Sequence, residues 1–275
     1  MRVVRLLVVV AVLMLAAGAV YAKESFIIGV APHTSARVIL EMYQPLRLHL
    51  EKVLGMPVEI ATAPDFDTFA RRGIAKEFDL AVTTGHQARL LQADAGYIPL
   101  LTYKADFKAV ALVAAKGAIQ KPSDLNKKDV LGLSPASLVT LWGQHWLIDN
   151  KVNANPMKYV SASDSVAQLV AVGDAAAGFT SLANYQKLPP ELRSQVRILA
   201  ESKSMAGRVY VLNKRHSAIQ KKIDAALWGF AETAEAKKYF ETNKLEGYRK
   251  LRPNELKEMD RYAAEVRKVL NSTEK

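Results

Sequence analysis

The sequence predicts an α/β fold built as two lobes. Short apolar runs alternate with longer amphipathic stretches, which is the order of strands and helices in a mostly parallel sheet covered on both faces. This alternation fills residues 26–103 and starts again at residue 129. Two more apolar runs, at residues 108–116 and 207–213, lie where the chain would enter the second lobe and return to the first. We therefore expect two lobes, each a mostly parallel sheet flanked by helices, joined by two hinge strands.

The elements of the first lobe follow from residue spacing. In residues 35–54, apolar side chains recur at intervals of three and four, as on a helix with one buried face. Gly96 closes a later helix, because glycine adopts the left-handed conformation at helix ends without strain. The other expected elements are strands at residues 25–31, 57–63, 79–84 and 97–103 and helices at residues 67–75 and 86–96.

The same order of elements returns in the second lobe, although no sequence repeat is strong enough to indicate duplication. Its expected elements are strands at residues 129–134, 157–162 and 175–181 and helices at residues 138–150 and 164–174. From His216 onward the pattern predicts helix throughout. The expected division of the chain is a signal peptide at residues 1–22, a first lobe at 23–110, a second lobe at 111–206, and a return to the first lobe with C-terminal helices at 207–275.

The N-terminus has the pattern of an export signal. Arg2 and Arg5 precede an apolar run that ends at Val20, and Val20 and Ala22 occupy the positions that a signal peptidase reads. The apolar run is short for a membrane-spanning helix. We expect cleavage after Ala22 and a periplasmic protein without stable membrane insertion; the alternative is a retained N-terminal anchor.

Composition and charge exclude several classes of function. The chain has 275 residues, a formal net charge of +11 and no cysteine, so disulfides, thiolate metal sites and cysteine nucleophiles are excluded. Cleavage of residues 1–22 would remove two arginines and no acidic residue. The remaining basic residues are scattered and few aromatic residues lie among them, which argues against a nucleic-acid partner. The positive charge favours anionic solutes instead.

Small hydroxyl side chains, together with a few histidines, follow nearly every expected strand. Ligands of open parallel sheets bind beyond the carboxyl ends of the strands, where helix N-termini present free N–H groups. Hydroxyl groups donate without adding charge, which suits a small oxyanion. The alternative at each position is helix capping, for which serine and threonine are also preferred. The residues that we expect to bind ligand at these positions are Thr83, Thr84, His86, Ser137, Ser163 and Thr180.

Motifs of catalysis are sparse. The chain has no metalloprotease, phosphate-loop or dinucleotide-binding signature. The string at residues 132–136 approaches a nucleophile elbow, but Ala136 replaces the second glycine and Pro135 lacks the N–H that an oxyanion hole requires. Trp142 and Trp146 lie at helical spacing, as core residues do. We therefore expect that the protein is not an enzyme and that it has no cofactor and no metal site.

Several strings, in order, resemble the phosphate-, phosphite- and phosphonate-binding proteins of ABC importers. They are EMYQPLRLHLEKVLGMPVEI, APDF, FDLAVTTG, and the segment from IPLLTYKADF to LGLSPAS. The resemblance covers most of the chain after residue 26. It implies the two-lobed type II periplasmic binding fold, with a ligand held between the lobes by hinge closure, and an inner-membrane ABC permease as partner.

The individual ligand residues of that family are mostly replaced. Phe66 stands where the family has a tyrosine, and a second family tyrosine falls near Thr83. Ser137 is the one match to the Ser-Thr-Ser-Gly anion loop, and a family histidine corresponds to about Ser163. Arg208, beside the returning strand, could pair with an anion through two N–H groups; its alternative is a surface arginine.

The sequence therefore predicts a monomeric periplasmic solute-binding protein. It would capture a phosphate- or phosphonate-like anion between two lobes for an ABC importer. One alternative is a ligand sensor for a histidine kinase or chemoreceptor. Another is an exported enzyme acting on a small phosphorylated substrate, for which His33 and His86 are the only acid–base candidates.

Overall fold

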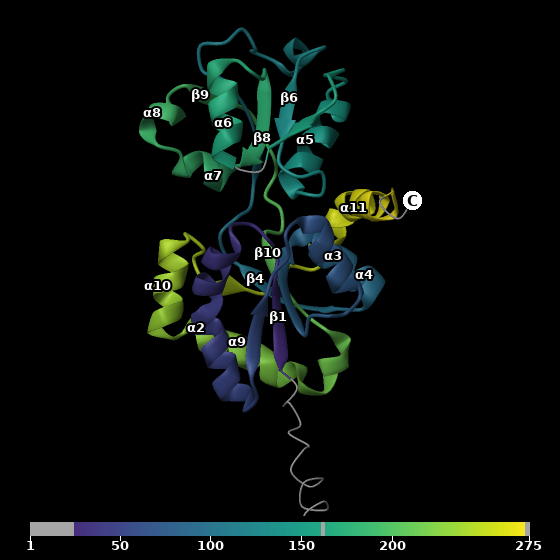
Figure 1. The fold of residues 1–275 in the computed structure, drawn as a ribbon, viewed down its shortest axis with the longest axis vertical. Helices are drawn as coiled ribbons and strands as arrows, with labels where there is room; N and C mark the ends of the chain where they lie inside the picture. The colour runs from purple at the N-terminus through teal and green to yellow at the C-terminus, as the bar shows by residue number, and fades with distance from the viewer. Residues whose placement is uncertain (1–24, 161–162, 273–275) are drawn as a thin grey trace, which may run out of the picture.

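The structure, a computed structural model, describes residues 25–160 and 163–272. The expected signal peptide lies outside these residues. The chain forms two α/β lobes stacked along the long axis of the molecule (Figure 1). The predicted fold class is therefore confirmed. Among the described residues, no helix is long and apolar enough to cross a membrane.

The first lobe contains a six-stranded sheet in the order β11-β4-β10-β3-β1-β2. β1 is parallel to β2 and β3, and β10 is antiparallel to both β3 and β4, so four strands share one direction. The strands are β1 (Phe26–Val30), β2 (Val58–Ala61), β3 (Leu80–Thr84), β4 (Ile98–Tyr103), β10 (Arg208–Leu212) and β11 (Tyr248–Arg249).

The second lobe contains a five-stranded sheet in the order β7-β6-β8-β5-β9. β6 is parallel to β7 and β8, whereas β5 is antiparallel to β8 and β9. The first sheet thus holds two strands that run against its parallel core, β10 and β11, and the second sheet holds one, β5. The strands are β5 (Ala109–Ala114), β6 (Val130–Gly132), β7 (Lys158–Tyr159), β8 (Ala177–Ser181) and β9 (Val196–Glu201).

The lobes are joined just before the two predicted hinge strands. β5 and β10 lie within the sheets, and the crossing segments are residues 104–108 and 202–207. Phe107 and Met205 form an antiparallel bridge between these segments, in which the Met205 N–H donates to the Phe107 carbonyl at 2.8 Å. The two connections therefore run side by side, as a double hinge does.

Helices cover both faces of the first sheet. α2, α9 and α10 pack on one face, and α3 and α4 on the other. Gly96 ends α4 with a φ of 73°, as the sequence predicts. The helices of this lobe are α2 (Ala36–Leu54), α3 (Phe66–Ile74), α4 (Gly85–Ala95), α9 (Gln220–Ala231) and α10 (Ala234–Thr242).

The second lobe has its own helical cover. Trp142 is buried against Phe179 and Trp146 packs beside it, so both belong to the core as expected. The helices are α5 (Leu138–Asp149), α6 (Ser163–Val172), α7 (Leu182–Lys187) and α8 (Pro190–Arg193). Short 3-10 turns occur at η1 (Pro122–Leu125), η2 (Lys214–Ile219) and η3 (Lys257–Met259).

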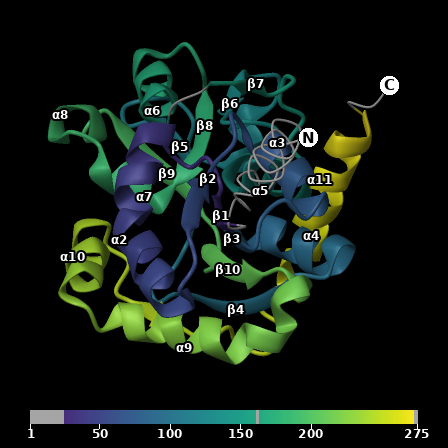
Figure 2. The same cartoon turned by 60° about the horizontal axis from the view of Figure 1, so that its bottom comes forward.

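The prediction of continuous helix after His216 is wrong. β11 pairs with β4 at the edge of the first sheet, and Gly247, with a φ of 90°, turns the chain into it. The final helix, α11 (Asp260–Ser272), leaves the other C-terminal helices and lies beside α4, on the opposite side from α10 (Figure 2). It also contacts the second lobe, since Arg261 lies 3.4 Å from Asp149 on α5.

Candidate ligand-binding site between the lobes

Besides His86 Nδ1, whose ring already bonds the second lobe through Nε2, five buried polar atoms near the junction of the lobes have no hydrogen-bond partner among the described residues. They are His33 Nε2, Tyr43 Oη, Thr84 Oγ1, Ser134 Oγ and Arg208 Nη1. Four belong to the first lobe, and Ser134 belongs to the loop after β6 in the second. We call these five side chains the interlobe polar set. Buried polar groups nearly always have partners, so this concentration of unpaired atoms indicates a place where a polar ligand would complete the bonding.

Strand ends bring most of the set together. Thr84 ends β3 and Arg208 begins β10, and these two residues are paired across the antiparallel strands. Both were predicted from the sequence. His33 follows β1, the neighbour of β3, and its ring lies 6.3 Å from that of Tyr43 on α2. Because β10 begins where the chain arrives from the second lobe, this end of the sheet faces that lobe (Figure 1).

The second lobe reaches the set through the loop after β6. His86 Nε2 donates to the Ala136 carbonyl at 2.9 Å, which joins the start of α4 to that loop. Thr84 lies two residues before His86, and Ser134 lies two residues before Ala136, so each belongs to one of the two segments that meet at this contact. His86, another predicted residue, is fully buried, and burial lowers its pKa to about 4. The structure therefore uses His86 as a neutral contact between the lobes.

Arg208 supplies a fixed positive charge to the set. Burial disfavours its charged form, but contacts with the polar hydroxyls of Tyr43, Tyr239 and Tyr103 favour it, and the pKa of Arg208 lies above the ordinary arginine value. The guanidinium is therefore charged at every physiological pH. Part of the residue is accessible to solvent, whereas its Nη1 atom is buried and, within the described chain, unpaired. A charged donor in this condition requires an acceptor, preferably an anionic one.

A network of tyrosine hydroxyls lies behind Arg208. Tyr103 is 2.7 Å from both Tyr210 and Tyr239, and Tyr210 is 2.8 Å from Tyr248. Burial raises the pKa of all four phenols, so they remain neutral. Their hydroxyls are already engaged with one another. The network therefore fixes the packing around Arg208 and adds no charge that would repel an anion.

His33 is an acceptor in the set. Its Nδ1 lies 2.8 Å from the Ala31 carbonyl oxygen, which can only accept, so the ring proton is on Nδ1. Burial, followed by the positive charge of Arg208, lowers the pKa of His33 well below its usual value. The ring is therefore neutral at pH 7. Its Nε2 presents a lone pair that no described side chain or backbone N–H meets.

Three other predicted residues are bonded within their own lobes. Thr83 donates to Gln87 at 3.0 Å, and Thr180 accepts from the Asn184 amide at 3.4 Å. Ser137 caps α5, and its hydroxyl also donates to a threonine one turn further on, at 2.8 Å. All three side chains are buried. The hydroxyls of Thr83 and Ser137 therefore donate to local partners, whereas the hydroxyl of Thr180 accepts from one.

Ser163 begins α6, and its side chain lies outside the described part of the chain.

Two members of the interlobe polar set had not been expected to bind ligand. Tyr43 stands on the buried face of α2. Ser134 lies two residues after β6, in the segment where the sequence predicts Ser137 as the ligand-binding hydroxyl. For His33, the sequence favours capping or a surface position over ligand binding and makes it an acid–base candidate in the enzyme alternative.

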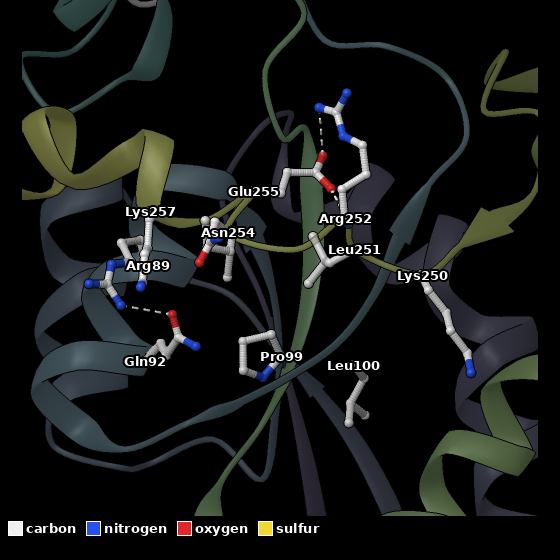
Figure 3. Close-up of a pocket in the computed structure, with 11 residues that line it drawn as sticks. Arg89, Gln92, Pro99, Leu100, Lys250, Leu251, Arg252, Asn254, Glu255 and Lys257 are labelled. Carbon is white, nitrogen blue, oxygen red and sulfur yellow. Dashed lines mark hydrogen bonds and ion pairs between the residues drawn. The ribbon is translucent and has the colours of Figure 1, made fainter.

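A pocket lies away from the junction, between α4, β4 and residues 250–257 (Figure 3). Its volume is about 420 Å³. Two of its charged lining residues are bonded: Arg89 to Gln92 at 3.0 Å, and Glu255 to Arg249, outside the lining, at 2.6 Å. None of the buried polar atoms that lack a partner in the described chain belongs to this lining. In the described chain, no group of three or more histidine, aspartate or glutamate side chains could hold a metal ion.

The fold is shared with several solved binding proteins. XAC2383 of Xanthomonas citri, solved with chloride, matches with a TM-score of 0.76 at 19% identity, over 90% of this chain and 99% of that chain. PhnD1 of Prochlorococcus marinus, solved with methylphosphonate, matches with a TM-score of 0.74 at 15% identity, over 89% and 98%. The aliphatic sulphonate-binding protein SsuA of Escherichia coli matches with a TM-score of 0.60 at 15% identity, over 91% and 84%. These likenesses place the chain in the type II periplasmic binding fold.

A comparison with curated protein sequences found no match. A family model described as "ABC transporter, phosphonate, periplasmic substrate-binding protein" matches residues 28–256, which is most of the chain. That family consists of substrate-binding proteins for transport and not of enzymes. The chain therefore belongs to the phosphonate-type periplasmic substrate-binding proteins of ABC transporters.

Proposed function

We propose that this protein binds a small oxyanion between its lobes in the periplasm and delivers it to an inner-membrane ABC permease. The observation that carries the proposal is the buried, unpaired Nη1 of Arg208 among the described residues. Neutral hydroxyls surround this cation, and their donors match the oxygen atoms of a tetrahedral anion. The family, the predicted export signal and the basic composition support the same conclusion.

Binding would be coupled to closure of the lobes. Arg208 and Thr84 belong to the first lobe and Ser134 to the second, so an anion bonded to all three holds the lobes together. The paired segments at residues 104–108 and 202–207 are the part of the chain that would flex. A ligand that contacts both lobes only when they are closed shifts the population toward the closed form, which the permease can recognise. The protein would do this as a monomer.

The class of anion follows from the chemistry of the site and its relatives. Of the related structures, PhnD1 was solved with methylphosphonate and SsuA is named for aliphatic sulphonates. In both ligand classes a central phosphorus or sulfur atom carries three oxygens and an organic group. The site of this chain offers one cation, one neutral acceptor and three hydroxyls, which suits a small monoanion. We therefore propose phosphonates and related oxyanions as the ligands of this site.

Calorimetric titration of the purified protein tests this proposal. Methylphosphonate, phosphate, sulfate and methanesulfonate are titrated into the unmodified protein, Arg208→Ala and Arg37→Ala. Arg37 is a control because its side chain is 82% exposed on α2. We expect at least one anion to bind, with a loss of about 100-fold in Arg208→Ala, since a buried charged hydrogen bond is removed. Arg37→Ala should bind normally. Binding by none of these anions, or equal binding by Arg208→Ala, would contradict the proposal.

A further inference from the structure

The orientation of His33 restricts which oxyanions can bind, if the proposed function holds. Its Nδ1–H is used by the Ala31 carbonyl at 2.8 Å, so Nε2 has only a lone pair to offer. That atom is buried and meets no donor among the described residues. A ligand oxygen placed against Nε2 must therefore carry a hydrogen. A fully deprotonated oxygen there would set two lone pairs against each other.

We propose that His33 makes this site specific for oxyanions that retain a proton, such as a monoprotonated phosphonate or phosphate, over sulfonates and sulfate. The anionic oxygens would face Arg208 and the hydroxyls, and the remaining P–O–H group would donate to His33 Nε2. A sulfonate has the same charge and nearly the same shape as a phosphonate monoanion. It has no O–H, so it leaves the histidine lone pair unpaired.

The surroundings of His33 keep its ring neutral. Arg208 on β10 and Lys187 at the end of α7 act on it, and both are cations that oppose a further positive charge. Tyr43 on α2 lies edge-on to the ring, and its hydroxyl donates to no described acceptor, Nε2 included. Burial and these cations hold the pKa of His33 well below its usual value. The ring is therefore neutral at neutral pH in the protein without ligand.

Charge pairing with Arg208 and selection by His33 predict opposite changes of affinity with pH. Simple charge pairing with an arginine would favour a phosphonate dianion over its monoanion, so affinity would rise with pH. Selection by His33 predicts the opposite. Above the second ionisation of the ligand, the protonated form becomes about tenfold scarcer with each pH unit, and affinity should fall by about that factor.

The experiment compares methylphosphonate with methanesulfonate by calorimetry between about pH 6 and pH 9. In the unmodified protein, methylphosphonate at low pH should bind about 10- to 100-fold more tightly than methanesulfonate, which is the range expected for one unmet buried acceptor. Its affinity should decline with rising pH, whereas that of methanesulfonate should stay constant. In His33→Gln, the side-chain amide can donate as well as accept, so the two anions should bind within about threefold of each other.

Each result has a definite meaning. Equal binding of both anions by the unmodified protein, or tighter methylphosphonate binding at high pH, overturns the role of His33 and leaves the proposed function intact. Failure of every anion to bind overturns the proposed function itself. If His33→Gln does not fold, as judged by its circular dichroism, the pH dependence of the unmodified protein still decides the question, because it requires no variant.

Discussion

Acid should destabilise this protein through His86, and the size of the effect follows from its burial. His86 is fully buried at the contact between α4 and the loop after β6, and its pKa is lowered to about 4. In the unfolded chain a histidine titrates near pH 6.5. Folding therefore favours the neutral ring. The stability that depends on this neutrality is complete above about pH 6.5 and is lost as the pH falls toward about 4, because the unfolded chain takes up its proton first.

Between about pH 7.5 and pH 5.0, this linkage costs about 2 kcal/mol of unfolding free energy, from 1.36 kcal/mol per pKa unit weighted by the protonated fractions. The matched variant is His86→Gln. Its amide can still donate to the Ala136 carbonyl, and it does not titrate. His33 contributes an acid-induced loss of the same sign, but it is present in both proteins, so the difference between them isolates His86.

Urea unfolding at the two pH values measures this difference. The unmodified protein should lose about 2 kcal/mol more than His86→Gln on acidification. Equal losses in the two proteins would refute the reasoning, because they would show that His86 has the same pKa in the folded and unfolded chains. A greater loss in His86→Gln would refute it as well.

Two further predictions concern packing and capping. Ser137→Ala should lower the unfolding free energy by about 1 kcal/mol, since it removes the cap of α5, and should leave anion affinity unchanged in calorimetry; a large loss of affinity would show that the hydroxyl reaches the ligand. Gly29→Ala should destabilise by about 1 to 3 kcal/mol in urea unfolding, because the new Cβ would lie 2.3 Å from the Phe78 ring. Gly229→Ala on α9 is the control, because the nearest atom to its new Cβ would be 3.9 Å away. Equal losses of unfolding free energy in the two variants would show that the contact with Phe78 is not the cause.

Most of the fold could be predicted from the sequence because its elements bury one face or both. β1 and α2 are recognisable by periodicity alone, and both appear within one residue of their expected limits. β11 is different. Its two residues have no periodicity, and they become a strand because Tyr248 is drawn into the tyrosine network beside Tyr103. A contact between residues so far apart in the sequence leaves no local signal.

The candidate site was harder to predict, because sequence reports which residues can bond and not which are already bonded. Thr83 and Thr84 are equivalent by residue type and position, yet Thr83 donates to Gln87 and Thr84 donates to no described group. Tyr43 shows the converse. It is buried on α2, although it is not among the residues that the sequence predicts for the buried face, and only the folded structure shows that its hydroxyl meets no described partner.

The unpaired atoms of the interlobe polar set also couple ligand binding to closure of the lobes. Each buried polar atom without a partner costs about 1 to 3 kcal/mol, and water would remove that cost if the lobes were apart. Closing the lobes around the interlobe polar set is therefore unfavourable unless a ligand supplies the missing bonds. A ligand that leaves even one atom unmet, such as a sulfonate against His33, recovers less of the cost of closure. Selectivity for the ligand and control of closure are thus consequences of the same unpaired atoms.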